Sequence, residues 1–245
     1  MRTWTQTLIF IATLWNASAL AEIIQMDSNF DGKMDQWQYK SDSGVIEKIE
    51  YDKNGDGNID QTDHYQGNPS PVKVEIDRNA DGAVDQIQYY SIEGRLQKIE
   101  KDYEFKKTID WIEYFDDQQK LTHIEADPNH DGQVDTRQFF NGEGKLIRAE
   151  FDLDHNGSID RWENYKADES LESVSFDTDG NSKPEQWQFF SQSGVLEKVG
   201  FDTNGDDKID RWKFYDSQGI LIRVEMDRNF DGSIDFIKRQ PKEDK

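Results

Sequence analysis

One motif recurs every 25 residues along this chain without insertion or deletion. It reads Asp-x-Asn-x-Asp-Gly-x-Ile-Asp in its most regular copies, and an aspartate opens each of nine successive copies. These nine residues are Asp27, Asp52, Asp77, Asp102, Asp127, Asp152, Asp177, Asp202 and Asp227. Self-similarity at such a period is typical of arrays whose units pack on their neighbours. We therefore expect a single repeat domain over residues 22–237.

The spacing of oxygen-bearing side chains in the motif matches the needs of a hard cation. Ca²⁺ takes about 6 to 8 oxygen ligands, supplied in such loops by side chains at positions 1, 3 and 5 and by the backbone carbonyl of position 7. We expect position 9 to close the shell, glycine at position 6 to make the turn, and an apolar residue at position 8 to anchor the loop in the core. The expected calcium ligands, in chain order, are Asp27, Asn29, Asp31, Lys33, Asp35, Asp52, Asn54, Asp56, Asn58, Asp60, Asp77, Asn79, Asp81, Ala83, Asp85, Asp127, Asn129, Asp131, Gln133, Asp135, Asp152, Asp154, Asn156, Ser158, Asp160, Asp177, Asp179, Asn181, Lys183, Glu185, Asp202, Asn204, Asp206, Lys208, Asp210, Asp227, Asn229, Asp231, Ser233 and Asp235.

These loops resemble the calcium loops of EF-hands, dockerins, thrombospondin calcium repeats and integrin-type propeller hairpins, which share the pattern D-x-[DN]-x-D-G. They depart from EF-hands at position 12, where the bidentate glutamate is replaced in most repeats, for example by Gln38, Asp63 and Lys213. Only 16 residues separate one loop from the next, which leaves no room for flanking helices. The resemblance that remains implies nine-residue loops that join β-strands. Ordinary acidic turns are the alternative, because Asp, Asn and Gly also favour turns.

The residues between the loops have the pattern of a β-hairpin. Aromatic residues alternate with polar ones, as in Trp187 and Phe189, which is typical of a strand with one buried face. A turn that ends in glycine follows, as at Gly194. The return strand has apolar residues three apart, such as Leu196 and Val199, and we expect its Lys and Glu residues on the opposite, wetter face.

The hairpins also resemble YD-type (RHS-like) repeats, whose pattern Y-D-x-x-G-x-L is matched from Tyr215 to Leu221. That resemblance implies a long β-meander that coils into a shell or spiral. We accordingly predict an all-β fold: an antiparallel β-meander repeat array with two strands per 25-residue repeat, coiled into a superhelix or shell. The alternative is a β-propeller with two repeats in each four-stranded blade.

Loop 4, residues 102–110, breaks the pattern. Lysine occupies position 5 at Lys106, and Lys107 replaces the glycine of position 6. An ammonium group among carboxylates can take the place of an ion, so we expect loop 4 to be empty and the chain to bind about eight Ca²⁺ ions.

The ends of the chain, its cysteine content and its charge restrict where the protein is expected to act and what it is expected to bind. Residues 1–21 have the basic start at Arg2, the apolar stretch and the Ala19–Ala21 small-residue site of a cleaved signal peptide, so we expect export to the periplasm or the exterior. Residues 238–245 are expected to form a charged tail, and no further stretch is apolar enough to span a membrane. The chain has no cysteine, which excludes disulfides and thiolate metal sites. A net charge of −22 disfavours nucleic acid as a partner.

We expect the protein not to be an enzyme. The four histidines, which are His64, His123, His130 and His155, are scattered and are interpreted as surface residues. The leading hypothesis is an exported calcium-binding repeat protein, in which Ca²⁺ rigidifies a scaffold for contact with a protein or glycan partner at the cell exterior. The alternatives are a calcium-responsive sensor or buffer, and a carbohydrate-binding module or degenerate hydrolase that uses the aromatic rows.

Overall fold

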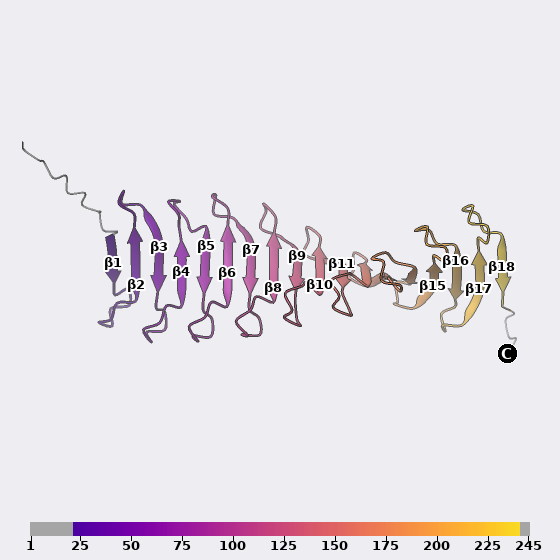
Figure 1. The fold of residues 1–245 in the computed structure, drawn as a ribbon, viewed down its shortest axis with the longest axis horizontal. Helices are drawn as coiled ribbons and strands as arrows, with labels where there is room; N and C mark the ends of the chain where they lie inside the picture. Colours follow the sequence, from indigo (N-terminus) through magenta and orange to yellow (C-terminus); the bar gives the residue numbers. More distant parts are fainter. Residues whose placement is uncertain (1–21, 241–245) are drawn as a thin grey trace, which may run out of the picture.

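Every strand pairs with the strand next to it along the chain. The computed structural model describes residues 22–240, and the signal peptide predicted over residues 1–21 lies outside them. The strands are β1 (Glu22–Met26), β2 (Gln36–Lys40), β3 (Ile46–Tyr51), β4 (Gln61–His64), β5 (Lys73–Ile76), β6 (Gln86–Tyr90), β7 (Leu96–Lys101), β8 (Trp111–Phe115), β9 (Leu121–Ala126), β10 (Thr136–Phe140), β11 (Leu146–Phe151), β12 (Arg161–Tyr165), β13 (Leu171–Phe176), β14 (Gln186–Phe190), β15 (Leu196–Phe201), β16 (Arg211–Tyr215), β17 (Leu221–Met226) and β18 (Phe236–Arg239). All 18 belong to one antiparallel sheet, which confirms the predicted all-β meander (Figure 1). The propeller alternative would need separate blades, and the sheet is instead continuous and open.

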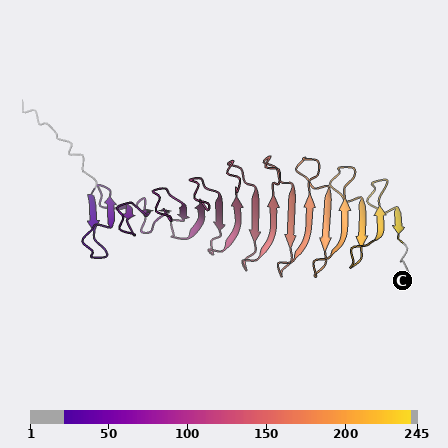
Figure 2. The same ribbon diagram turned by 90° about the horizontal axis from the view of Figure 1, so that it is seen from below.

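The sheet is long, narrow and twisted. In Figure 1 the sheet is seen nearly edge-on between β11 and β15, whereas in Figure 2 the edge-on stretch lies nearer the N-terminus, so the sheet turns about its long axis. This is the twist expected of L-residues in extended conformation. The nine acidic loops follow β1, β3, β5 and every second strand thereafter, and the short hairpin turns follow the strands between them. All acidic loops therefore lie at the same ends of the strands, along one long edge of the sheet. Among the described residues no helix is long and apolar enough to cross a membrane.

One side of the sheet, here called the aliphatic face, carries the most deeply buried apolar residues. Position 23 of each repeat lies opposite position 12, as Ile49 lies opposite Gln38 on one side and Asp63 on the other. The buried members of this row are 1 to 9 % exposed: Ile49, Val74, Ile124, Ala149, Val174, Val199 and Val224. Each lies on a strand flanked by two neighbouring strands of the single sheet, and no second layer is present among the described residues.

A β-bulge in most hairpins explains why apolar residues recur three apart. In the hairpin of β10 and β11 the register shifts between Phe139 and Phe140, so that Phe139 faces Arg148 and Phe140 faces Leu146. The skipped residue, Ile147, is 40 % exposed. The bulge changes the alternation of side chains, and positions 20 and 23 consequently share the aliphatic face.

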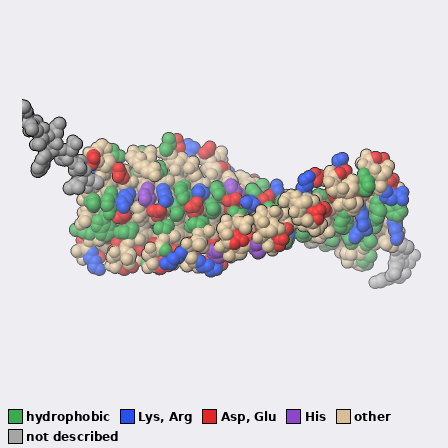
Figure 3. Space-filling view, viewed as in Figure 1, with side chains coloured by type: hydrophobic (Ala, Val, Ile, Leu, Met, Phe, Trp, Pro, Cys, Tyr) green, Lys and Arg blue, Asp and Glu red, His purple; other side chains and the backbone are tan. Residues whose placement is uncertain are grey.

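The opposite side, here called the aromatic face, carries positions 11 and 13. As predicted, the basic and acidic residues of the return strand lie opposite its apolar positions. Their face is, however, the aromatic one and not a separate wet surface, because Trp37 pairs with Glu50 and Tyr39 pairs with Lys48. The ammonium of Lys48 lies 4.2 Å from the Tyr39 ring centre, and the Tyr39 hydroxyl donates to Glu50 at 2.6 Å. The charges thus cover the rings, and Figure 3 shows basic and acidic side chains in a row among hydrophobic ones.

This cover of charges replaces a second layer of protein. The lysine or arginine lies over the ring in further hairpins, at 4.3 Å for Lys98 and Tyr89 and at 3.9 Å for Arg223 and Phe214. Each cation–π contact of this kind stabilises by about 0.5–1 kcal/mol at an exposed site. The tryptophans at position 11, for example Trp187, are consequently half-buried rather than fully enclosed.

Candidate metal centre

The acidic loops are held by backbone hydrogen bonds to their first and last acids, at position 1 in all nine loops and, from the N–H of position 2, at position 9 in every loop but loop 5. In loop 1, the N–H of Gly32 donates to Asp27 Oδ2 at 2.8 Å, and the N–H of Ser28 donates to Asp35 Oδ1 at 2.9 Å. These two acids are largely buried in most loops, and Asp85 and Asp102 are only 1 % exposed. Positions 1 and 9 therefore have a structural role in the loop independent of any ligand.

Positions 3 and 5 tighten the turn between these anchors. Asn29 Oδ1 accepts the N–H of Asp31 at 2.9 Å, and Asp31 Oδ1 accepts the N–H of Lys33 at 2.9 Å. Position 6 has positive φ in every loop, as predicted for its glycines. Position 4 does so as well, including Phe30 at 61° and His155 at 59°. Side chains adopt this conformation at a cost, and the sequence gives no glycine signal for it in six of the nine loops.

The donated N–H groups keep the loop acids ionised. The N–H of Ser28 holds the pKa of the Asp35 carboxyl below its usual value. Burial opposes ionisation of Asp177, but the N–H groups of Gly180 and Ser182 outweigh it and lower the pKa of that carboxyl. The loops thus present negative charge at neutral pH, as cation binding requires.

Positions 1, 3 and 9 converge where all three are acidic. Oxygen atoms of Asp152, Asp154 and Asp160 lie within 4.8 Å of one another in loop 6. The acids Asp177, Asp179 and Glu185 do the same in loop 7. Three carboxylates at this separation can surround a divalent cation.

Position 3 is asparagine in six of the other loops, and its amide donates to the acid of position 9 in loops 2 and 5 and to the acid of position 5 in loops 1 and 9. Asn54 Nδ2 donates to Asp60 Oδ1 at 3.0 Å in loop 2. The third acid of such loops is at position 5, and within the described residues no group of positions 1, 5 and 9 comes together as closely as the acids of loops 6 and 7. Position 7, predicted to bind through its backbone carbonyl, donates its N–H to the acid of position 5, as Lys33 does to Asp31. In loop 8 its side chain reaches the same acid, with the Lys208 ammonium 3.9 Å from Asp206.

Loop 4 keeps the shared backbone fold although its ligand set is broken. Asp102 accepts the N–H groups of Lys106 and Lys107 at 2.9 and 2.5 Å, as in the intact loops. The Lys106 ammonium lies 2.5 Å from Glu104, and both side chains are about half exposed. The lysine therefore pairs with one exposed carboxylate, rather than sitting among three as the sequence suggested.

Successive loops are joined directly to one another. The N–H of Asp52 donates to the carbonyl of Asp35 at 2.9 Å, and the equivalent bond links every loop to the next. Side chains add to these links, as where Lys183 contacts Asp207 at 2.7 Å. The predicted anchoring by position 8 is weaker than expected, since Met34 and Val84 are 48 and 42 % exposed.

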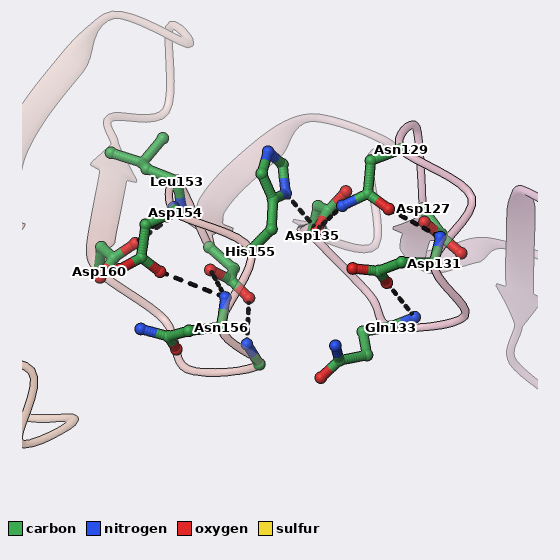
Figure 4. Close-up of polar contacts among 12 residues, drawn as sticks. Asp127, Asn129, Asp131, Gln133, Asp135, Leu153, Asp154, His155, Asn156 and Asp160 are labelled. Atoms are coloured by element: carbon green, nitrogen blue, oxygen red, sulfur yellow. Dashed lines mark hydrogen bonds and ion pairs between the residues drawn. The ribbon is translucent and has the colours of Figure 1, made fainter.

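Two of the histidines interpreted as surface residues connect neighbouring loops. His130 Nε2 lies 3.2 Å from Lys106 Nζ of loop 4. His155 Nδ1 lies 2.7 Å from Asp135 Oδ1 of loop 5, and this contact raises the pKa of His155 (Figure 4). Both occupy position 4, whose positive φ directs them to the preceding loop.

Comparison with known proteins leaves the family open. No family model matches the chain, and no curated protein does. Solved structures with similar segments include the complex of TcdB2, TccC3 and Cdc42, at 12 % identity and a TM-score of 0.24, covering 83 % of this chain and 12 % of that one. The Tc holotoxin pore of Photorhabdus luminescens is 13 % identical with a TM-score of 0.26, covering 82 % and 12 %. The chain thus spans about an eighth of the length of these proteins, and similarity this low supports no conclusion about function.

Proposed function

We propose that this chain is an exported, non-catalytic calcium-binding repeat protein, and that Ca²⁺ in the acidic loops stiffens an elongated β-scaffold which binds a partner at the cell exterior. The observation that supports this most directly is the convergence of three carboxylates in loop 6 and again in loop 7. The same positions carry oxygen-bearing side chains in all the loops, so one geometry can serve the whole edge.

The placement of the loops supports a structural role for the metal. Each loop joins the return strand of one repeat to the first strand of the next, and its first N–H bonds to the loop before it. An ion held by positions 1, 3 and 9 would therefore fix the angle between consecutive repeats. It would also neutralise the repulsion along an edge that carries several ionised acids per loop.

The aromatic face bears on the choice between a scaffold and a sugar-binding module. A sugar stacks on the open face of a ring, but the rings of Tyr39, Tyr89 and Phe214 are covered by lysine or arginine at 4.2, 4.3 and 3.9 Å. This mixed pattern of cations, carboxylates and apolar edges suits a protein partner better than a glycan.

The proposal is tested by calcium titration of the mature chain after chelation. We expect calcium to raise the melting temperature, and native mass spectrometry to count about eight ions at saturation. Asp154→Ala should remove one ion, because Asp154 is exposed and contributes mainly to the acid cluster of loop 6.

Glu104→Ala is the matched control, since it alters position 3 of the loop expected to be empty and should leave the count unchanged. An identical melting temperature with calcium and with chelator would refute the calcium proposal. A count of nine ions would refute the assignment of loop 4 as empty.

A further inference from the structure

The fifth loop, residues 127–135, differs from the others in its buried acid Asp135. In the other eight loops the N–H of position 2 donates to the acid of position 9, as Leu153 does to Asp160 at 2.7 Å. Position 2 of loop 5 is Pro128, which has no N–H. Asp135 is only 3 % exposed, and its Oδ2 has no hydrogen-bond partner.

A second unpartnered oxygen lies at the other end of the same loop. Oδ1 of the first aspartate accepts an N–H from position 4 or 5 in the other eight loops, as Asp152 does from Asn156 at 3.2 Å. In loop 5 the N–H of His130 instead donates to the backbone carbonyl of Asp127 at 3.3 Å. Asp127 Oδ1 remains buried without a partner, and these are the only such carboxylate oxygens in the described part of the chain.

The next loop places a nitrogen atom beside Asp135. His155, at position 4 of loop 6, holds its Nδ1 2.7 Å from Asp135 Oδ1, while Asn129 Nδ2 lies 3.2 Å from the same oxygen. Figure 4 shows Asp135 between Asn129 and the imidazole. First-row divalent cations bind imidazole nitrogen and carboxylate oxygen at about 2.0–2.2 Å, so two of their ligands lie roughly 3 Å apart.

One repeat earlier, the histidine at position 4 contacts positions 3 and 5 of the preceding loop, not its position 9 acid. There His130 reaches back to loop 4, whose Lys106 ammonium is 3.2 Å from its Nε2. Loop 5 has an aspartate, Asp131, where loop 4 has this lysine. Asp135 therefore has an imidazole at one carboxylate oxygen and no partner at the other, and loop 5 lacks the internal positive charge of loop 4. Asp127, Asp135 and His155 lie farther apart than the three acids of loops 6 and 7, so a bound cation would have to draw them together.

We propose that loop 5 and His155 form a mixed carboxylate–imidazole site for a divalent cation of the Zn²⁺ class, bridging two repeats. Imidazole favours Zn²⁺ over Ca²⁺, which binds oxygen ligands. The site goes beyond the calcium function proposed above and does not require the other loops to bind calcium.

The test is a Zn²⁺ titration of the full mature chain in excess Ca²⁺, followed by calorimetry and native mass spectrometry. We expect one Zn²⁺ per chain, and a nitrogen ligand in the X-ray absorption spectrum of the bound Zn²⁺. His155→Ala should weaken binding on the order of tenfold or more. Ala80 already occupies position 4 of loop 3 with φ of 59°, so this variant is compatible with the loop.

Two further variants make the result specific to this junction. His64→Ala is the matched control, since His64 on β4 makes a contact of the same 2.7 Å with Glu75 away from loop 5, and it should leave Zn²⁺ affinity unchanged. Pro128→Ala restores an N–H at position 2, offers Asp135 a donor, and should weaken Zn²⁺ binding. Unchanged binding in His155→Ala, or no Zn²⁺ bound by the wild type, would overturn the proposal. Zn²⁺ binding without any effect of calcium on melting would instead refute only the calcium function.

Discussion

The most direct test of the loop architecture is removal of the first acid of loop 4. Asp102 is 1 % exposed and accepts two backbone N–H groups, from Lys106 and Lys107, at 2.9 and 2.5 Å. Hydrogen bonds to a charged acceptor each contribute about 1.5–3 kcal/mol. The two donors are partly buried and regain some water in the variant, so we expect Asp102→Ala to cost about 3 kcal/mol. Asp102→Asn keeps one acceptor oxygen and should cost about half as much.

Amide hydrogen exchange measures this cost locally, which suits an array whose repeats open separately. Loss of about 3 kcal/mol corresponds to roughly a hundredfold faster exchange of the Lys106 and Lys107 amides. The effect should be equal with calcium and with chelator. Glu104→Ala, in the same loop, breaks only an exposed ion pair and should change exchange little. Unchanged exchange in Asp102→Ala would refute the structural role of position 1, and a cost seen only with calcium would make Asp102 a metal ligand.

Four further substitutions test the hairpins. Ile124→Ala should lower the free energy of unfolding in urea by about 2 kcal/mol, at the low end for core truncation, because no second layer holds the space open. The pKa of Tyr89 is raised to about 12 by burial and by its hydrogen bond to Glu100. The protonated hydroxyl therefore contributes fully to the free energy of unfolding below pH 10, and this contribution is lost as the pH rises to 12. Tyr89→Phe should therefore make the melting temperature fall less steeply over that range. Gly144 has φ of 80° and no atom lies near where its Cβ would be, so Gly144→Ala should lower the free energy of unfolding by about 1 kcal/mol through backbone strain alone. Gln119 occupies the same turn position with φ of 61°, so Gln119→Gly should raise the free energy of unfolding by about as much.

Each of these predictions has a contradicting result. A cost above about 4 kcal/mol for Ile124→Ala would mean that the aliphatic face is enclosed like an ordinary core. Parallel alkaline melting curves for Tyr89→Phe and the wild type would show that the Glu100 contact does not stabilise the fold. A stabilising Gly144→Ala would place the turn in another conformation.

The repeat period and the local chemistry of the turns were enough to predict the meander. Two strands per repeat, glycines with positive φ at the turns, and acidic loops between hairpins all follow from residues close together in sequence. The assignment of faces did not follow. Lys48 and Tyr39 are neighbours only through the bulged register of their hairpin, and bulges are specified by the pairing of two strands, not by the alternation within one.

The loops were predicted as acidic cation sites from their spacing, and loop 4 as an exception, but the distinct hydrogen bonding of loop 5 was not predicted. The contact between His155 and Asp135 depends on the positive φ of position 4, which six loops adopt without glycine. One signal was available: Pro128 at position 2 removes an N–H that all other loops use. Its effect is visible only once the partner of that N–H is known.

The serial pairing of strands determines how the molecule responds to tension. β1 and β18 lie at opposite ends of the sheet, and every described strand contacts only the strands before and after it (Figure 1). A pull on the two ends loads the hydrogen bonds of the terminal strand pairs, β1–β2 and β17–β18, first. The strand pairs then separate one after another. Each 25-residue repeat spans about 10 Å in the sheet and about 80 Å when extended. The chain would thus unfold under force in equal steps of one repeat each. A cation bound in a loop would raise the force needed for the step that opens that loop.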